Sequence, residues 1–379
     1  MATVSHTEAE NVALQSYFRE GEARAMTLGN RGPARFTADG KLAPEIVEAY
    51  LKFGFYVFEN VFSEQEVAEI RAEFFGVLDR LPVRRDAEVD HLGRPALGVG
   101  LPVSPFHWSK PLGDPFGGAG GMARAPVKMM EGKAKASQPE EVVFIIRAPT
   151  YFSDAALRAY AHPTLLGIAA TINGEDFVPF SEGFVVKQPG AGAAFAWHQD
   201  GTTHWDNPDW EPQIHGFNFM TQLYKSTAAN GLWYVPGSHA KGKVDIKARV
   251  EAAGGNLLPD AVPLVCNPGD VAISNRQILH GSFANSSDDW RVSLNTGFHP
   301  RKSILGVRGR NPNREVAYDE ECIRKRSELI GYAIDVRRQR YPAETPFVYQ
   351  PHVQEGAAFV WNDAARSALS GYYMLDLNI

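Results

Sequence analysis

The sequence lacks three features that would each indicate a particular class of protein. It has only two cysteines, Cys266 and Cys322, in 379 residues, too few for a disulfide framework and not spaced as a zinc site, so both are expected to be free thiols. No stretch approaches the ~18 apolar residues that a membrane span requires, and the N-terminus has neither the charged nor the apolar part of a signal peptide. These absences predict a soluble, cytoplasmic protein without a membrane partner.

Basic residues are not in surplus either. Lysine and arginine number 38 against 44 aspartates and glutamates, for a formal net charge of −6. Proteins that bind nucleic acid usually carry a basic surplus, and no basic stripe with interleaved aromatic residues is present here. Nucleic acid is therefore not expected as a partner, and a small-molecule substrate is.

The residues that are present predict a single domain with additional helices and loops. With 44% hydrophobic residues it can bury a large core. Residues 1–40 show no sustained period and predict a loose lead-in, whereas short strands separated by Pro, Gly and Asn dominate residues 184–298. Residues 97–136 are dense in Gly, Pro and Met, which predicts a long loop that could act as a lid. Residues 301–379 predict a helical extension packed on the domain, with a surface helix over 320–340 that could also serve subunit contact in a homo-oligomer.

Three side chains have the chemistry of a metal site. His198 and Asp200 are two residues apart, so on a strand both leave the same face and can bind one ion. His280 follows a turn and an alternating apolar run, at the end of a predicted strand. Two imidazoles and one carboxylate on one face of an octahedron suit non-haem Fe(II), because three adjacent positions stay open.

Arg291 begins the next alternating run, after a polar turn, and so starts the strand that neighbours the strand of His280. A planar guanidinium suits bidentate binding of a carboxylate. Arg291 is therefore predicted to hold the far end of a dicarboxylate whose other end chelates the iron.

These residues and five short motifs in order resemble the phytanoyl-CoA dioxygenase family of Fe(II)- and 2-oxoglutarate-dependent oxygenases. The likeness runs from about Leu42 to about Pro300 and comprises Gly54 to Val57 with Ser63 to Glu66, Trp197 to Asp200, Asn230 to His239, Pro268 to Asp270, and His280 to Ser282 with Arg291. The resemblance implies a mainly β fold with peripheral helices, a double-stranded β-helix (a cupin-like jelly-roll barrel) over residues 41–300. It also implies iron on His198, Asp200 and His280, with 2-oxoglutarate held by Arg291 and the hydroxyl of Ser282.

The resemblance further implies the reaction. Fe(II), 2-oxoglutarate and molecular oxygen would oxidise an unactivated carbon of a small organic substrate, with release of succinate and CO2. Asp200 favours hydroxylation, desaturation or ring formation, because relatives that halogenate have a small residue at that position. Whether a coenzyme A thioester is required stays open.

Two amides are weaker candidates. Gln188 and Asn218 lie on predicted strands near the motif and could reach the keto acid or the iron-bound oxygens. An equally good interpretation is that both are core residues whose amides form hydrogen bonds with the backbone. The loop at 97–136 also carries Arg124, Lys128, Lys133 and Lys135 in an acidic protein. This cluster is consistent with a solvated face or with a lid for an anionic substrate.

Two alternatives to this function remain at the level of sequence. One is a cupin-like metal-dependent enzyme that does not use 2-oxoglutarate, against which Arg291 stands in register with His280. The other is a catalytically silent barrel that acts as a binding module, against which all three metal ligands are intact.

Overall fold

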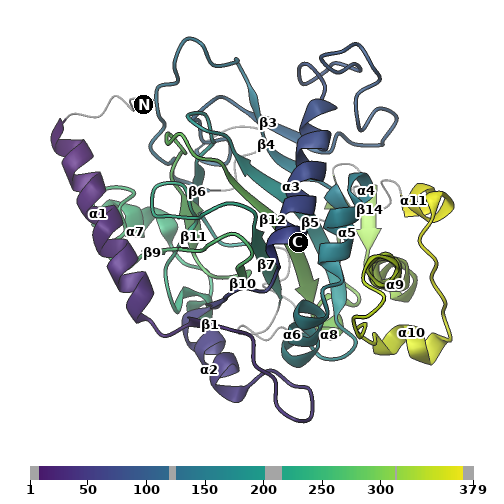
Figure 1. Ribbon diagram of the computed structural model, residues 1–379. Coiled ribbons are helices and arrows are strands. Elements are labelled where there is room, and N and C mark those ends of the chain that lie inside the picture. Colours follow the sequence, from purple (N-terminus) through teal and green to yellow (C-terminus); the bar gives the residue numbers. More distant parts are fainter. Residues whose placement is uncertain (1–7, 119–124, 201–215, 312–313, 370–379) are drawn as a thin grey trace.

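Two facing β-sheets form the centre of the computed structural model, which describes residues 8–118, 125–200, 216–311 and 314–369 (Figure 1). The major sheet has eight strands, in the spatial order β1 (Arg31–Gly32), β2 (Phe55–Phe58), β10 (Val271–Asn275), β7 (Phe217–Gln222), β12 (Arg291–His299), β5 (Val178–Lys187), β4 (Val142–Arg147) and β3 (Phe106–Ser109). The minor sheet has four, in the order β6 (Phe195–His198), β11 (His280–Ser282), β8 (Trp233–Tyr234) and β9 (Val262–Pro263). The predicted jelly roll is confirmed, and its two sheets stay separate instead of closing into one barrel.

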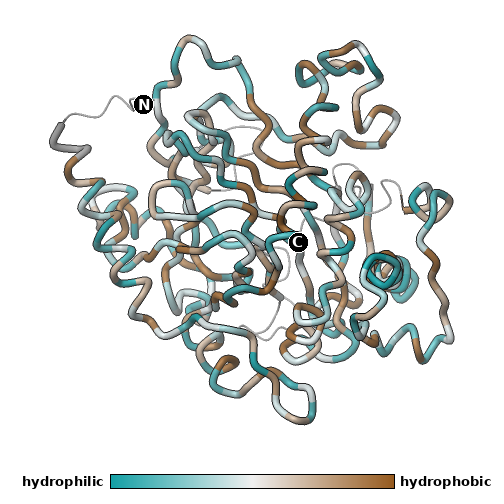
Figure 2. Tube along the Cα trace, in the orientation of Figure 1, coloured by the Kyte–Doolittle hydropathy of each residue, from teal (hydrophilic) through white to brown (hydrophobic). Residues whose placement is uncertain are grey.

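Helices cover the outer faces of the sheets. They are α1 (Glu8–Thr27), α2 (Pro44–Phe53), α3 (Glu64–Asp79), α4 (Pro149–Phe152), α5 (Asp154–Tyr160), α6 (Pro163–Asn173), the 3-10 helix Ser238–Lys241, α7 (Ile246–Ala252), α8 (Arg301–Ile304), α9 (Glu320–Arg340), α10 (Gln350–Glu355) and α11 (Asp363–Leu369). Figure 2 shows apolar residues along the central strands and hydrophilic ones around α9. Among the described residues, no helix combines the length and the apolar character that crossing a membrane requires.

The local sequence fixes the end of α2 and the start of α3, on either side of strand β2. Pro44 occupies the first turn of α2, where its missing N–H costs no hydrogen bond, and Gly54 ends the helix at a φ of 82°, a left-handed conformation that favours glycine. In α3 the hydroxyl of Ser63 accepts a hydrogen bond from the backbone N–H of Glu66, and the side chain of Glu66 accepts one from the backbone N–H of Ser63. These two ends fix where the strand β2 enters the sheet.

The prediction of a loose lead-in over residues 1–40 is wrong for Glu8–Thr27, which form the long helix α1 beside the minor sheet. Tyr17 stacks on Trp233 of β8, with ring centroids 4.5 Å apart, and its hydroxyl donates a hydrogen bond of 2.8 Å to the carbonyl of Leu258. Phe18 is buried in the same cluster. The helix therefore closes the outer face of the sheet that carries the two histidines.

The loop expected over 97–136 also differs from the prediction in part. Phe106–Ser109 form β3, which pairs with β4 at the edge of the major sheet. Lys128 forms a 2.8 Å ion pair with Glu131. Residues 119–124, in the middle of the predicted loop, lie outside the described residues. The segment therefore contributes a strand as well as loop to the rim of the sheet.

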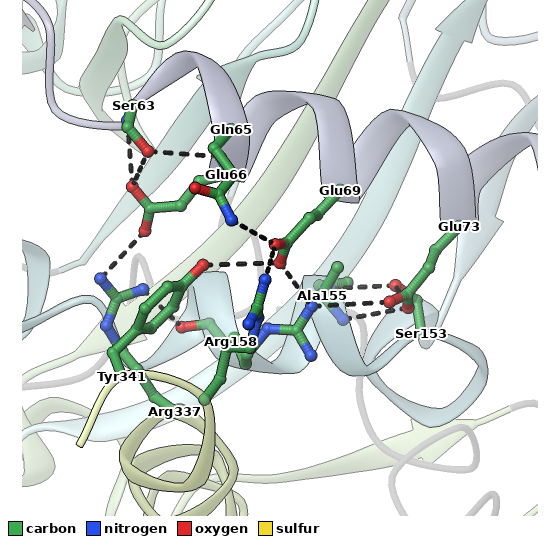
Figure 3. Close-up of polar contacts among 12 residues, drawn as sticks. Ser63, Gln65, Glu66, Glu69, Glu73, Ser153, Ala155, Arg158, Arg337 and Tyr341 are labelled. Atoms are coloured by element: carbon green, nitrogen blue, oxygen red, sulfur yellow. Dashed lines mark hydrogen bonds and ion pairs between the residues drawn. The ribbon is translucent and has the colours of Figure 1, made fainter.

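Ion pairs join α9 of the C-terminal extension to the rest of the fold. Arg337 on α9 pairs with Glu66 of α3 at 3.0 Å, and Arg158 of α5 pairs with Glu69 of α3 at 3.0 Å (Figure 3). Burial raises the pKa of Glu66, but hydrogen bonds from Ser63 and the charge of Arg337 outweigh it and hold that pKa below its ordinary value. Charged contacts therefore fix α9 against α3.

Candidate metal and co-substrate site

Two short strands bring the three predicted metal ligands together. His198 ends β6 and His280 begins β11, and the two are direct partners in the antiparallel register. Asp200 lies just beyond β6, with one carboxylate oxygen 3.7 Å from Nε2 of His198 and the other 3.9 Å from Nε2 of His280. One potential ligand atom from each residue lies within 4.8 Å of the other two. A single ion with ligand distances of roughly 2.0–2.2 Å fits between them.

Backbone carbonyls orient both imidazoles toward that point. Nδ1 of His198 lies 2.6 Å from the carbonyl oxygen of Ala196, and Nδ1 of His280 lies 2.8 Å from that of Ile278. A proton on each Nδ1 makes these contacts hydrogen bonds and leaves the Nε2 lone pair for a metal. The donor set and its orientation therefore fit Fe(II), as the sequence predicts.

Gln199, between His198 and Asp200, fixes the metal-binding motif from the side that faces away from the metal. The amide nitrogen of Gln199 donates hydrogen bonds to the carbonyls of Gln277 (2.7 Å) and Gly242 (3.1 Å), and its oxygen accepts one from the backbone N–H of Val244 (2.8 Å). Gln199 therefore faces away from the metal, as alternation along a strand requires, and links the ligand strand to two neighbouring segments.

A cavity of about 200 Å³ opens beside the triad, and both predicted co-substrate residues line it. Arg291 begins β12 and Ser282 ends β11, with exposed fractions of only 2% and 1%. Nε of Arg291 and Oγ of Ser282 are buried without a hydrogen-bond partner among the described residues. Buried polar atoms are normally satisfied, so this pair indicates a polar ligand, and the chemistry of a guanidinium and a hydroxyl fits a carboxylate of 2-oxoglutarate.

Burial lowers the pKa of Arg291 to about 10. Its partner in the strand register is Lys187 of β5, a fully buried lysine whose amine donates a hydrogen bond to the carbonyl of Phe283. Burial first, and then the positive charge of Arg291, lower the pKa of Lys187 well below its ordinary value, although Asp114 acts in the opposite direction. Burial and the charge of Arg291 thus both act against the charged form of Lys187.

The two amides predicted as weaker candidates have different positions. Asn218 on β7 lines the cavity, and its Oδ1 accepts a 3.3 Å hydrogen bond from Arg276. Gln188 is not among the lining residues; it follows the end of β5, where its carbonyl accepts hydrogen bonds from Asn285 (3.3 Å) and Gly192 (3.0 Å). A role for Gln188 at the co-substrate therefore stays a prediction, and the described cavity wall does not include this residue.

Sequence reasoning missed the wall of the cavity formed by Arg276, Phe180 and Glu182. Arg276 is charged but follows directly on the buried strand β10, shortly before His280, and a charged residue between a predicted strand and a predicted ligand was the available signal. Phe180 and Glu182 give no comparable signal, because their position depends on the strand pairing of β5.

Comparisons with known proteins agree with this geometry. A family model described as phytanoyl-CoA dioxygenase (PhyH) matches residues 50–293. Phytanoyl-CoA dioxygenase 1 of Oryza sativa subsp. japonica is 31% identical over 119 residues, which are 29% of this chain and 41% of that protein. Dioxygenase lolE1 of Epichloe uncinata is 31% identical over 146 residues, which are 38% of this chain and 54% of that protein. The chain thus spans about half the length of the curated relatives it matches.

Among solved structures, the fold is similar to that of EctD from S. alaskensis, crystallised with 2-oxoglutarate and 5-hydroxyectoine. The TM-score is 0.50 at 19% sequence identity, and the match covers 72% of this chain and 81% of that one. At this identity the similarity concerns the fold alone.

Proposed function

Because the chain belongs to the phytanoyl-CoA dioxygenase family, we propose that this Fe(II)- and 2-oxoglutarate-dependent dioxygenase hydroxylates an unactivated carbon of a small organic molecule. The observation that carries the proposal is the shared cavity. One wall has the three ligands His198, Asp200 and His280, and another has the buried guanidinium of Arg291.

Each of the two alternative functions leaves one of these two groups of residues without a role. A cupin-like enzyme that uses only substrate and oxygen has no need of a buried cation that lies beside the metal ligands without a carboxylate partner. A silent binding module has no need of two histidines whose Nε2 atoms are aimed at one carboxylate. The combination favours a metal that binds a dicarboxylate.

Each residue of the chain then has a defined task. His198, Asp200 and His280 would hold the iron, and Asp200 would occupy the position that halogenating relatives leave open. Arg291 and Ser282 would bind the distal carboxylate of 2-oxoglutarate and so fix its direction in the cavity. Bound together, iron, 2-oxoglutarate and oxygen supply the oxidising power, with succinate and CO2 as co-products. The buried surroundings exclude water from the reacting groups.

The test is anaerobic titration of the purified protein with Fe(II) and then with 2-oxoglutarate, followed by visible absorption. We expect a charge-transfer band that saturates at one equivalent of each, because the chelate needs both walls of the cavity. Arg324→Gln on α9, where the side chain is 49% exposed, is a matched control that changes charge away from the site. Iron binding without any effect of 2-oxoglutarate would favour the cupin-like alternative, and absence of iron binding would favour the silent barrel.

A further inference from the structure

The strand of His198, β6, stands at one edge of the minor sheet, and part of the segment predicted as a loop runs beside it. The buried backbone N–H of Ala194 donates a 2.9 Å hydrogen bond to the carbonyl of Gly113. Further along the strand, the N–H of Ala196 donates one of 3.3 Å to Oδ1 of Asp114. Buried N–H groups at a sheet edge need partners. Here the chain that follows β3 supplies one main-chain acceptor and one side-chain acceptor.

The carboxylate of Asp114 joins three segments that are distant in sequence. The residue is 6% exposed. Besides the bond from Ala196, Oδ1 accepts hydrogen bonds from the backbone N–H groups of Phe116 (3.1 Å) and Gly117 (3.0 Å), and Oδ2 accepts one from that of Met129 (2.8 Å). The bonds from Phe116 and Gly117 close a tight local turn. The bond from Met129 spans 15 positions and the bond from Ala196 spans 82, so these two fix the loop against the ligand strand.

The packing around this carboxylate is close. A Cβ at Gly117 would lie 2.7 Å from Cα of Lys128 and 2.8 Å from the carbonyl oxygen of Val127, and it would also collide with Oδ2 of Asp114. Burying a carboxylate is costly unless hydrogen bonds compensate the lost water, and both oxygens of Asp114 have such bonds. Glycine at position 117 therefore leaves the space in which the carboxylate sits.

The bond from Ala196 connects Asp114 with a metal ligand. The carbonyl oxygen of Ala196 lies 2.6 Å from Nδ1 of His198 and orients the imidazole. A displacement of Ala196 would therefore turn the Nε2 lone pair of His198 away from the metal. The oxygen of Asp114 that binds Ala196 also holds the backbone of Phe116, whose ring lines the cavity, with its centroid 6.4 Å from that of the His198 ring. One carboxylate oxygen thus fixes both the direction of a ligand and the aromatic wall beside it.

We propose that Asp114 is a positioning residue of the iron site, which acts through Ala196 on the direction of His198; the inference rests on the proposed function. Groups that orient a metal ligand from outside the coordination sphere typically contribute about 10- to 100-fold to metal affinity. Asp114 has such a position although it is not one of the three metal ligands. The chain between β3 and β4 then serves the metal centre as well as the rim of the sheet.

The experiment separates the local turn from the bond to the ligand strand. Asp114→Ser keeps an oxygen for the turn but is one bond too short to reach Ala196 and Met129. Asp114→Asn keeps an acceptor in the place of Oδ1 and loses only the bond from Met129. Fe(II) affinity is measured by anaerobic titration calorimetry without 2-oxoglutarate, and the visible absorption band is recorded after 2-oxoglutarate is added. We expect the serine variant to bind Fe(II) about 10-fold more weakly and to shift the band, and the asparagine variant to stay within about threefold of the wild type with an unshifted band.

Asp90→Ala is the matched control for a buried carboxylate that organises a loop. Asp90 is 1% exposed, and its Oδ1 accepts hydrogen bonds from the backbone N–H groups of Leu92 (2.9 Å) and Arg94 (3.0 Å). None of these three residues belongs to the described wall of the cavity. The control should unfold at a lower urea concentration than the wild type, with the iron affinity and the absorption band unchanged, as a purely structural role predicts.

Gly117→Ala keeps the test decisive if the serine variant does not fold, because it displaces the carboxylate of Asp114 without removing it. It should also weaken Fe(II) binding about 10-fold. Wild-type iron affinity and an unshifted band in the serine variant, or in Gly117→Ala where the serine variant does not fold, would overturn the inference. Equal losses in the serine and asparagine variants would overturn it as well, because the effect would then follow the charge and not the bond to Ala196. Failure of the wild type to form the band with Fe(II) and 2-oxoglutarate would instead overturn the proposed function.

Discussion

Replacement of Arg291 by methionine should make the ligand-free protein more stable and abolish most of its affinity for 2-oxoglutarate. Arg291 is 2% exposed, its Nε has no hydrogen-bond partner, and no carboxylate of a described residue forms an ion pair with it. Burial lowers its pKa to about 10, which corresponds to a penalty of roughly 3 kcal/mol for keeping the charged form inside the free protein. Methionine fills a similar space without a charge, so we expect a gain of about 1–3 kcal/mol in the free energy of unfolding.

The same substitution should weaken the binding of 2-oxoglutarate by at least ~100-fold. Removal of one partner of a buried, hydrogen-bonded charge pair costs about 2–5 kcal/mol, and here it would leave the distal carboxylate of 2-oxoglutarate beside an apolar side chain. Iron binding should be little affected, because Arg291 is not one of the three residues whose ligand atoms gather around one point.

Urea unfolding with and without 2-oxoglutarate, under anaerobic conditions with Fe(II), measures both effects. At 100 times its dissociation constant, a ligand stabilises the folded state by about 2.7 kcal/mol. The variant should therefore unfold at a higher urea concentration than the wild type without 2-oxoglutarate, and this advantage should shrink or reverse when 2-oxoglutarate is saturating for the wild type. Arg324→Met, at an exposed ion pair, controls for loss of charge. A variant that is less stable than the wild type without ligand, or equally stabilised by 2-oxoglutarate, would refute the reasoning.

Three other perturbations have defined outcomes. Alanine at His198, Asp200 or His280 should abolish stoichiometric Fe(II) binding in metal analysis with an unchanged circular dichroism spectrum, and iron retained by the double histidine variant would contradict the assignment. Arg337→Met should lower the free energy of unfolding in urea by about 3 kcal/mol, because the arginine side chain is 6% exposed and leaves two carboxylates unpaired; iron affinity should not change. Burial lowers the pKa of His162 to about 4, so its contribution to stability is intact above its unfolded pKa of about 6.5 and is lost as the pH falls toward 4. His162→Gln should flatten that part of a pH series of urea unfolding curves, and an unchanged slope would exclude this histidine as the cause.

The sequence was sufficient for the metal ligands because their chemistry and their strand period constrain each other. His198 and Asp200 share one face of a strand whatever the surrounding fold, and iron accepts few other combinations of donors. The position of Arg291 follows from the polar turn that precedes it, which sets the hairpin with the strand of His280. The two-residue period and the turn are local, whereas the meeting of His280 with His198 depends on the pairing of β11 with β6.

The features that sequence reasoning missed depend on contacts between distant residues. The helix α1 is stabilised by Trp233 and Leu258, which are more than 200 positions away, and its own apolar residues are too few to predict burial. The strand β3 lies within a glycine-rich segment and forms because β4 offers a free edge. The end of β5 at Lys187, just before Gln188, is set by its pairing with β12, which the sequence does not reveal.

Two of the buried polar groups that the described part of the fold leaves without a hydrogen-bond partner lie where a ligand is needed. Ser282 and Arg291 lie on adjoining walls of one cavity, and each has a buried polar atom without a protein partner. Lys187, their equally buried neighbour, donates a hydrogen bond to the backbone carbonyl of Phe283, and burial lowers its pKa well below the ordinary value. A fold that could satisfy the lysine could also have satisfied the arginine, so the exception at Arg291 is better explained by a ligand than by poor packing. An anion that binds there recovers the cost of burying the charge, which is why co-substrate affinity and stability should change in opposite directions when Arg291 is replaced.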